Sequence, residues 1–228
     1  MHVLVTGGAG FIGSHLAEHH LAKGDSVHVV DDLSTGRREN IEPFLDSTKF
    51  QFDEADILTW PGLEKATIWA DRIYHMAAVV GVFRVLEDPI RVLATNIAGT
   101  ERLLRYASAG HWKPQIIITS SSEVYGPTSE ELLQEDAMLY VYSGAKSRWN
   151  YAISKLADEN QGLSYARQHG MPICIVRLFN TVGPRQRGRY GMVVPRFVAQ
   201  AMAGEAITIY GGGTQTRSFC DVRDTVVA

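Results

Sequence analysis

The first thirteen residues constrain the fold more than any other part of the sequence. The apolar run HVLVT, residues 2–6, leads directly into TGGAGFIG, which places Gly7, Gly10 and Gly13 at the spacing GxxGxxG. The apolar run predicts a buried strand, and residues 11–23 then follow the period of an amphipathic helix. A glycine turn between a strand and a helix is typical of a parallel sheet covered by helices.

The same alternation continues along the chain. Further apolar runs predict strands over residues 26–31, 49–56, 71–77, 115–119 and 173–178. Helical periods cover residues 89–109, 149–169 and 193–203. Together they predict an α/β fold, a Rossmann-type doubly wound parallel sheet whose ligands bind beyond the carboxyl ends of the strands. We expect this domain to occupy residues 1–180, and the start of a small second lobe, with a short strand over ITIY at 207–210, to occupy residues 181–228.

Composition narrows the class of protein. The 228 residues carry a formal net charge of −3, which gives no electrostatic reason to expect a nucleic acid or an anionic membrane as a partner. The longest apolar runs are far shorter than the roughly 20 residues of a membrane helix, and the first strand follows no charged leader. We therefore expect a cytoplasmic protein. Cys174 and Cys220 stand far apart, which predicts two buried thiols and neither a disulfide nor a metal site.

The glycine turn predicts a dinucleotide site. Glycine lets the backbone approach a pyrophosphate, which the free N–H groups at the start of the next helix attract. Asp31 and Asp32 end the second predicted strand, and a carboxylate at that place accepts hydrogen bonds from the adenosine ribose and repels a 2′-phosphate. NAD is therefore predicted over NADP, although both aspartates could simply cap a turn. Asp56 and Ile57, after the third strand, are expected beside the adenine or in an ordinary turn.

A second pattern, YAISK, places Tyr151 and Lys155 four residues apart on one face of a predicted helix. A phenol with a pKa near 10 is a poor base at neutral pH, but an adjacent ammonium group stabilises its phenolate. The same spacing is common in surface pairs. Behind a dinucleotide motif, however, it indicates a base that removes the proton of an alcohol being oxidised.

The motifs in order resemble the extended short-chain dehydrogenase/reductase family, and within it the NAD-dependent nucleotide-sugar epimerases, dehydratases and decarboxylases. The resemblance rests on TGGAGFIGSHL, DDLSTG, HMAA, TNIAGT, SSSEVYG, YAISK, RLFNTVGPRQ and GGGTQTRSF, which span nearly the whole chain. It implies a tightly held NAD that transiently oxidises a sugar hydroxyl and later returns the hydride. It also implies a nucleotide-sugar substrate, expected to be UDP-linked.

The resemblance assigns roles to particular residues. Ser121 matches the hydroxyl that binds the reacting oxygen, Tyr151 the base and Lys155 its partner, and Glu123 faces the sugar as a further catalytic candidate. The implied cofactor-binding residues are Gly7, Gly10, Phe11, Ile12, Gly13, Asp31, Asp32, Asp56, Ile57, Ala77, Ala78, Asn96, Ser120, Tyr151 and Lys155. The implied substrate-binding residues are Asn180, at the sugar diphosphate, and Arg217, at the nucleotide phosphates; Arg185, Arg187 and Arg189 either line the same cleft or form a solvated loop.

The reaction depends on Glu123. In the family, simple 4-epimerases usually carry an uncharged residue there, dehydratases carry Asp-Glu, and decarboxylases carry Ser-Glu, as Ser122 and Glu123 do here. The missing Asp argues against dehydration. Because many epimerase-like members also contain SEVYG, our first interpretation is an NAD-dependent nucleotide-sugar 4-epimerase, and the alternative is a UDP-glucuronate-type decarboxylase.

Length leaves two other functions open. Family members continue well beyond the last residue of this chain, so it resembles a member lacking most of the C-terminal lobe. One possibility is a truncated NAD-binding protein without catalytic activity, against which the presence of Ser121, Tyr151 and Lys155 argues. The other is an alcohol or carbonyl oxidoreductase for a small substrate, against which the sugar-phosphate motif at Asn180 argues. In the family, helices matching residues 89–109 and 149–169 pair across a two-fold axis, so a homodimer is expected.

Overall fold

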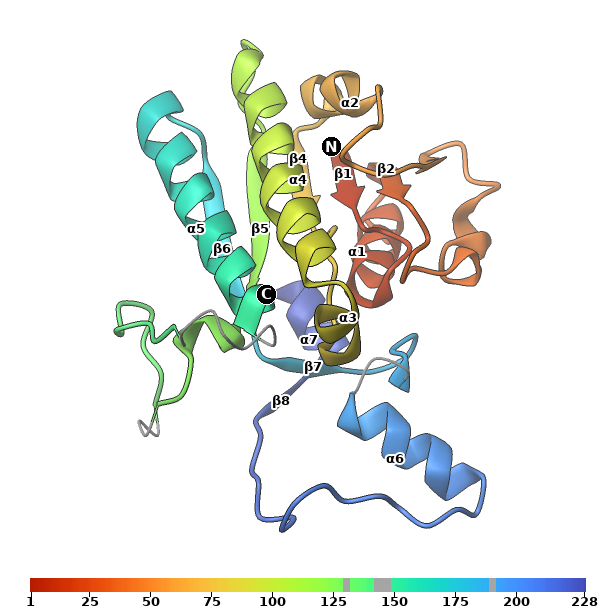
Figure 1. The fold of residues 1–228 in the computed structure, drawn as a ribbon. Helices are drawn as coiled ribbons and strands as arrows, with labels where there is room; N and C mark the ends of the chain where they lie inside the picture. The colour runs from red at the N-terminus through yellow and green to blue at the C-terminus, as the bar shows by residue number, and fades with distance from the viewer. Residues whose placement is uncertain (129–131, 142–148, 189–191) are drawn as a thin grey trace.

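The computed structural model describes residues 1–128, 132–141, 149–188 and 192–228. A six-stranded parallel sheet in the order β3-β2-β1-β4-β5-β6 forms its centre (Figure 1). The strands are β1 (His2–Thr6), β2 (Ser26–Asp31), β3 (Phe50–Glu54), β4 (Arg72–His75), β5 (Gln115–Ser121) and β6 (Ile173–Leu178). The predicted α/β class and doubly wound sheet are confirmed. The strand order reverses between β1 and β4, so a crevice opens beyond their carboxyl ends.

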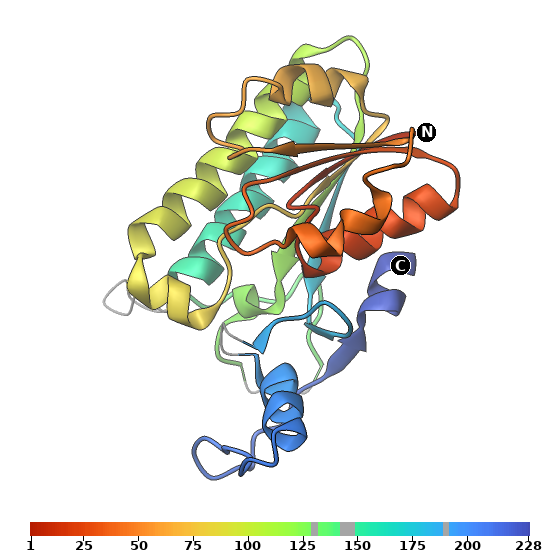
Figure 2. The same ribbon diagram turned by 90° about the vertical axis from the view of Figure 1, so that its right-hand side faces the viewer.

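Helices cover both faces of the sheet (Figure 2). One face carries α1 (Phe11–Ala22), and the other carries α2 (Leu63–Trp69), α4 (Pro89–Ala109) and α5 (Asn150–His169). Sequence signals set the ends of the longer helices: Asp88 caps α4 by accepting a 3.0 Å hydrogen bond from the Arg91 N–H, and Gly170 ends α5 in a left-handed conformation. The short helices are α3 (Val82–Glu87), η1 (Arg38–Asn40), η2 (Glu42–Phe44) and η3 (Ser122–Tyr125).

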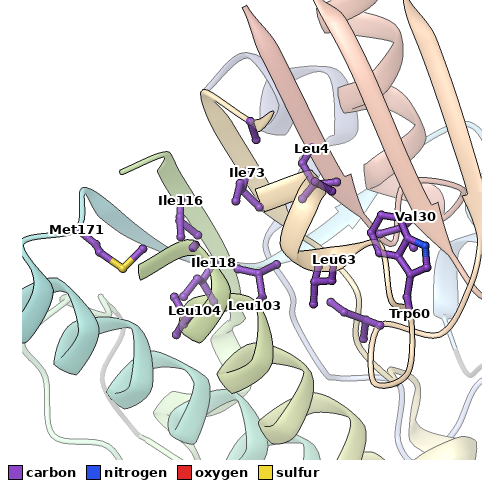
Figure 3. Close-up of a cluster of buried hydrophobic side chains, with 14 residues drawn as sticks. Leu4, Val30, Trp60, Leu63, Ile73, Leu103, Leu104, Ile116, Ile118 and Met171 are labelled. Carbon is purple, nitrogen blue, oxygen red and sulfur yellow. The ribbon is translucent and has the colours of Figure 1, made fainter. Parts of the chain in front are cut away.

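Successive side chains of the strands point to opposite faces of the sheet and form two apolar clusters, one on each face. On the α4 side, Ile73, Ile116 and Ile118 pack against Leu103 and Leu104 (Figure 3). Ile73 lies directly opposite Ile116 in the parallel register of β4 and β5. On the α1 side, the cluster consists of Val3, Val5, Val27, Val29 and Ala17. The strands are apolar on both faces because each face is covered by helices, and the packed layers hold their carboxyl ends in place.

The second lobe is small. It contains β7 (Asn180–Val182) and β8 (Phe219–Asp221), which pair in parallel, together with α6 (Val193–Met202) and α7 (Val222–Val227), which packs on α1. The strand expected over 207–210 is wrong. Thr208 hydrogen-bonds to Gln200 and Arg196 of α6, so the backbone around it has partners other than a neighbouring strand.

The structure also differs from the sequence prediction at one cysteine. Cys174 is exposed and Cys220 only half-buried, so the expectation of two buried thiols is wrong. Because β6 is an edge strand, Ile173 and Ile175 pack toward the core and Cys174 points to the opposite, uncovered side. No helix within the described ranges is long and apolar enough to span a membrane.

Candidate functional site

A cavity of about 400 Å³ lies at the carboxyl ends of the strands. It brings together residues that are far apart in the sequence, from the glycine turn to the loops of the second lobe. The predicted residues that line it are Gly7, Gly10, Phe11, Ile12, Gly13, Asp31, Asp32, Asp56, Ile57, Ala77, Ala78, Ser120, Ser121, Glu123, Tyr151, Lys155 and Asn180. Asn96 and Arg217 do not line it.

The glycine turn fits a pyrophosphate. Gly7 has a φ of +70°, and a Cβ there would lie 2.7 Å from the Ala77 nitrogen. A Cβ on Gly13 would lie 2.3 Å from the Gly7 carbonyl oxygen, so only glycine lets α1 start this close to β1. Gly10, the N-cap of α1, has no side chain to cap the first-turn N–H groups, and that turn carries no acidic residue. These N–H groups are therefore suited to bind phosphate.

Asp31, the last residue of β2, and Asp32 accept hydrogen bonds from backbone N–H groups, and Asp31 also holds the glycine turn. Asp31 accepts hydrogen bonds from the N–H groups of Ala9, at 3.0 Å, and Leu33, at 2.8 Å. Burial raises the pKa of Asp31 to about 6, against the opposing effect of these bonds. Asp32 accepts a 2.9 Å bond from the Ser34 N–H. Because a carboxylate offers about four acceptor positions, turn capping leaves room for ribose hydroxyls.

The adenine end of the cavity has a support that the sequence motifs do not contain. Asp56 accepts a 2.8 Å hydrogen bond from the Leu58 N–H, as in an ordinary Asx turn. Arg102 of α4 donates to the carbonyl oxygens of Ile57, at 2.5 Å, and Trp60, at 2.9 Å. The guanidinium thus ties the turn after β3 to α4 and fixes Ile57 at the cavity wall.

Asn96 supports the cavity from behind. It is 1% exposed, its Oδ1 accepts a 2.8 Å hydrogen bond from the Val79 N–H, and its Nδ2 donates to the Ser154 hydroxyl at 2.9 Å. Val79 lines the cavity and Ser154 lies on α5. Asn96 therefore joins the chain after β4 to the helix that carries Tyr151.

Tyr151 and Ser121 both line the cavity, and their side chains are placed to hydrogen-bond each other. Burial, followed by the negative charges of Glu123 and Asp158, raises the pKa of Tyr151 above its usual value, and the bond from Ser121 acts in the opposite direction. Lys155 forms a buried ion pair with Asp158, with 3.0 Å between Nζ and Oδ2. The sequence pattern contained Lys155 but gave no indication of this partner.

Ser120, beside the catalytic candidates, is anchored to α5. Its hydroxyl donates a 2.5 Å hydrogen bond to Glu159, and Arg177 of β6 forms a two-pronged ion pair with the same carboxylate at 2.9 and 2.8 Å. These bonds tie the end of β5 to its neighbours, so the backbone that carries Ser121 is firmly placed.

The second lobe contributes fewer of the predicted contacts. Asn180 lines the cavity and donates a 2.9 Å hydrogen bond to the Ser218 carbonyl, whereas Arg217 is exposed and bonds only to the adjacent Thr216 carbonyl in the described structure. Arg185 and Arg187 line the cavity, and Arg185 forms a 2.6 Å ion pair with Glu18 of α1. Arg189 lies outside the described residues.

Sequence reasoning also missed an apolar part of the cavity wall, formed by Met192, Val193, Val194 and Pro195. These residues carry no chemical motif, and only the fold places them there. In the described part of the chain, no group of His, Cys, Asp or Glu side chains is arranged to hold a metal ion. The arrangement can bind a dinucleotide and remove a proton from a hydroxyl beside it.

Comparisons with known proteins agree with this geometry. A family model described as the NAD dependent epimerase/dehydratase family matches residues 3–228. A UDP-N-acetyl-alpha-D-glucosaminuronate decarboxylase of Bacillus cytotoxicus is 39% identical over 226 residues, which make up 99% of this chain and 68% of that protein. The UDP-glucuronic acid decarboxylase 1 of Danio rerio is 36% identical over 98% of this chain, which spans 52% of that protein.

A solved structure shows the same fold. The UDP-glucuronic acid 4-epimerase from Bacillus cereus, in complex with UDP-glucuronic acid and NAD, superposes with a TM-score of 0.84 at 35% identity, over 99% of this chain and 71% of that one. This chain thus spans between about half and seven tenths of the length of these similar proteins.

Proposed function

This chain belongs to the NAD-dependent epimerase/dehydratase family, and we propose that it uses NAD to decarboxylate a UDP-linked uronic acid. The observation that carries the proposal is the meeting of Tyr151, Ser121 and Glu123 in one cavity with the dinucleotide-binding turn. Two relatives named as UDP-uronate decarboxylases, at 39% and 36% identity, support the choice of reaction. They favour our alternative interpretation of the sequence over the 4-epimerase that we placed first.

We propose that NAD binds in this cavity. The α1 N-terminus and the glycine turn would hold the pyrophosphate, Asp31 and Asp32 the adenosine ribose, Ile57 the adenine side and Lys155 the nicotinamide ribose. When bound there, NAD would accept a hydride from C4 of the sugar, return it later and add a positive charge beside Tyr151. The carboxylates near the ribose would disfavour a 2′-phosphate.

Tyr151 is the proposed base for the first step. Its phenolate oxygen takes the proton of the C4 hydroxyl while C4 is oxidised to a ketone, and Ser121 hydrogen-bonds the same oxygen of the sugar. The position of both side chains in the cavity wall supports this arrangement. Lys155, one helical turn along α5, supplies the ammonium charge that favours the phenolate.

Decarboxylation follows from the ketone. The C5 carboxylate is then β to a carbonyl, so the bond between C5 and the carboxyl carbon breaks, carbon dioxide leaves, and the electron pair forms an enolate across C5 and C4. A proton added at C5 restores the ketone before C4 is reduced again. Glu123 is the proposed residue for handling this proton, because it lines the cavity and its charge acts on Tyr151.

A 4-epimerase remains the second candidate. The Bacillus cereus structure with UDP-glucuronic acid and NAD belongs to a protein named as a UDP-glucuronic acid 4-epimerase. Epimerisation needs the same oxidation at C4 and only a change in the face on which the hydride returns. Both candidates share a uronate substrate, and they differ in the fate of its carboxylate.

One experiment separates these functions. The purified protein is incubated with NAD and UDP-glucuronate, and in parallel with UDP-glucose, while released carbon dioxide and the C4 epimer are measured separately. Carbon dioxide from UDP-glucuronate is the expected product. An epimer without carbon dioxide would favour the second candidate. NAD binding without turnover of either sugar would favour an NAD-binding protein, or an oxidoreductase for a smaller alcohol or carbonyl substrate.

We predict that NAD raises the melting temperature of the protein much more than NADP at equal concentration. A ligand that binds only the native state stabilises it in proportion to its affinity, and Asp31 and Asp32 would repel the 2′-phosphate. Differential scanning fluorimetry at matched concentrations measures the two shifts. Equal shifts would contradict the assignment of these carboxylates to the ribose.

We also predict that NAD affinity falls as the pH drops below about 6. The pKa of Asp31 is raised to about 6, so below that pH the ligand-free protein increasingly carries a protonated carboxyl. Ribose hydroxyls donate to the ionised form, and each pH unit below the pKa is expected to weaken binding by about tenfold. Calorimetric titration between pH 5 and 8 measures the effect. Asp31→Asn, which cannot titrate, should lack this pH dependence.

We propose that the protein forms a homodimer through α4 and α5. The two helices lie side by side on one face of the sheet. A closed dimer that repeats this pair across a two-fold axis would form a four-helix bundle. Light scattering at micromolar concentration is expected to give twice the 25.2 kDa mass of the chain. A monomer mass would contradict the proposal.

A further inference from the structure

The ion pair between Lys155 and Asp158 is unusually well buried. Their side chains are 2% and 0% exposed, with 3.0 Å between Nζ and Oδ2. Lys155 lines the cavity and Asp158 does not, so the carboxylate approaches the ammonium from the protein interior. Removing two charges from water is costly, and the attraction between them offsets that cost only if both groups are held in good geometry.

Packing alone does not explain why a carboxylate is buried at position 158. The Oδ1 atom of Asp158 has no hydrogen-bond partner among the described residues, while the Thr100 hydroxyl of α4 lies near the carboxylate and favours its ionised form. Burial raises the pKa of Asp158, and the charge of Lys155 acts in the opposite direction. An apolar residue would fill this place without the cost of burying a charge. The position of the carboxylate therefore points to a use.

A chain of hydrogen bonds continues from Thr100 into the sheet. His75 Nε2 lies 3.0 Å from the Thr100 hydroxyl, His75 Nδ1 lies 2.8 Å from the Thr6 hydroxyl, and the Ala77 N–H donates to Thr6 at 3.2 Å. Burial, followed by the charge of Lys155, lowers the pKa of His75 to about 3, so its ring is neutral at pH 7. One ring nitrogen must then donate and the other must accept.

The ionised carboxylate of Asp158 can only accept hydrogen bonds. It therefore sets which group donates and which accepts in each hydrogen bond of this series. A Thr100 hydroxyl turned toward Asp158 donates to the carboxylate, so His75 donates to Thr100 from Nε2 and Thr6 donates to His75 Nδ1, which leaves Thr6 as the acceptor for Ala77. Each hydroxyl gives one bond and takes one. The chain links α5, α4, β4 and β1 to one carboxylate.

We propose that Asp158 is a positioning residue that holds the Lys155 ammonium at the cavity wall, and that Thr100, His75 and Thr6 hold Asp158 in turn. This inference rests on the proposed function, in which Lys155 binds the nicotinamide ribose and assists Tyr151. Asp158 does not line the cavity, so its effect on cofactor binding is expected to act through Lys155. Its effect on cofactor binding must therefore disappear when Lys155 is absent.

A double-mutant cycle tests this dependence. Wild type, Lys155→Met, Asp158→Asn and the double variant are compared by calorimetric titration with NAD. Asp158→Asn is expected to weaken NAD binding by about tenfold in the wild type and to have no further effect beside Lys155→Met. Equal weakening in both backgrounds, or none in either, would overturn the proposal.

The same four proteins give a second measurement without cofactor. Lys155→Met leaves a buried carboxylate unpaired, so its melting temperature is expected to fall by roughly 10 °C. Adding Asp158→Asn removes the unpaired charge and should recover most of that loss. Additive losses would show that the two side chains do not depend on each other, and would also overturn the proposal.

Variants of Thr100 test the supporting chain. Thr100→Val removes the hydroxyl at nearly the same volume and should weaken NAD binding, whereas Thr100→Ser should restore it. Thr67→Val is the matched control, since Thr67 is equally buried but donates to the Glu64 carbonyl away from the cavity. A wild type that failed to bind NAD would contradict the proposed function instead, and the melting temperatures would then decide whether the ion pair exists.

Discussion

Tyr151→Phe is expected to lower turnover of the sugar nucleotide on the order of a thousandfold or more, while NAD binding stays nearly unchanged. The ring packs among Val79, Val85 and Val92, and phenylalanine preserves that packing. Only the hydroxyl is lost, and with it the group proposed to take the C4 proton. Single-turnover measurements with UDP-glucuronate give the rate, and the thermal shift with NAD reports binding.

Tyr125→Phe is the matched control for this change. Tyr125 is buried, does not line the cavity, and has the Arg177 guanidinium 4.8 Å from its ring centroid. It should retain nearly wild-type turnover despite losing the same atom. Equal activity of Tyr151→Phe and the wild type would move the proton transfer to another residue and contradict the proposed mechanism.

Glu123→Gln is expected to reduce carbon dioxide release by on the order of a hundredfold or more, the usual scale for a positioned acid or base. Glutamine keeps the size and much of the hydrogen bonding of the side chain but cannot exchange a proton. If the enzyme only epimerised, no proton would move at C5, and the same change would lower the rate only modestly. Carbon dioxide and epimer are measured separately for both proteins.

Glu135→Gln provides the comparison, because Glu135 is exposed and does not line the cavity. Its carbon dioxide release should match the wild type. Epimer formation that survives in Glu123→Gln, from a wild type that releases no carbon dioxide, would make the 4-epimerase the better assignment. Carbon dioxide release that is insensitive to Glu123 would place the C5 proton on another group.

Local patterns predicted the sheet and much of the cavity. HVLVT, SVHVVD and QIIIT became buried strands of one sheet, because short apolar runs between helical segments have few other ways to bury both faces. The glycine turn could also be predicted from the sequence, since a Cβ atom on Gly7 or Gly13 would clash with neighbouring backbone atoms. These features depend on residues close together in sequence or on a strong steric rule.

Long-range pairs could not be predicted in the same way. Asp158 is an unremarkable residue on an amphipathic helix until the fold buries it beside Thr100, and Arg102 gains its role only when the turn after β3 lies against α4. The prediction of a strand over residues 207–210 was wrong, because an alternating pattern of apolar residues does not show whether a partner strand is present. Arg217, expected at the nucleotide phosphates, lies outside the cavity in this structure.

Helix α4 (Pro89–Ala109) supports the cavity from behind at two points in its middle part. Asn96 holds the chain after β4, and Arg102 holds the turn after β3, six residues further along the same helix. At 1.5 Å per residue, the two anchoring points are separated by about 9 Å along the helix axis. The helix therefore fixes the spacing between the chain after β4 and the turn after β3. A one-residue insertion between Asn96 and Arg102 would lengthen that spacing by about 1.5 Å and rotate one anchor relative to the other by about 100°, so Asn96 and Arg102 could no longer reach both partners.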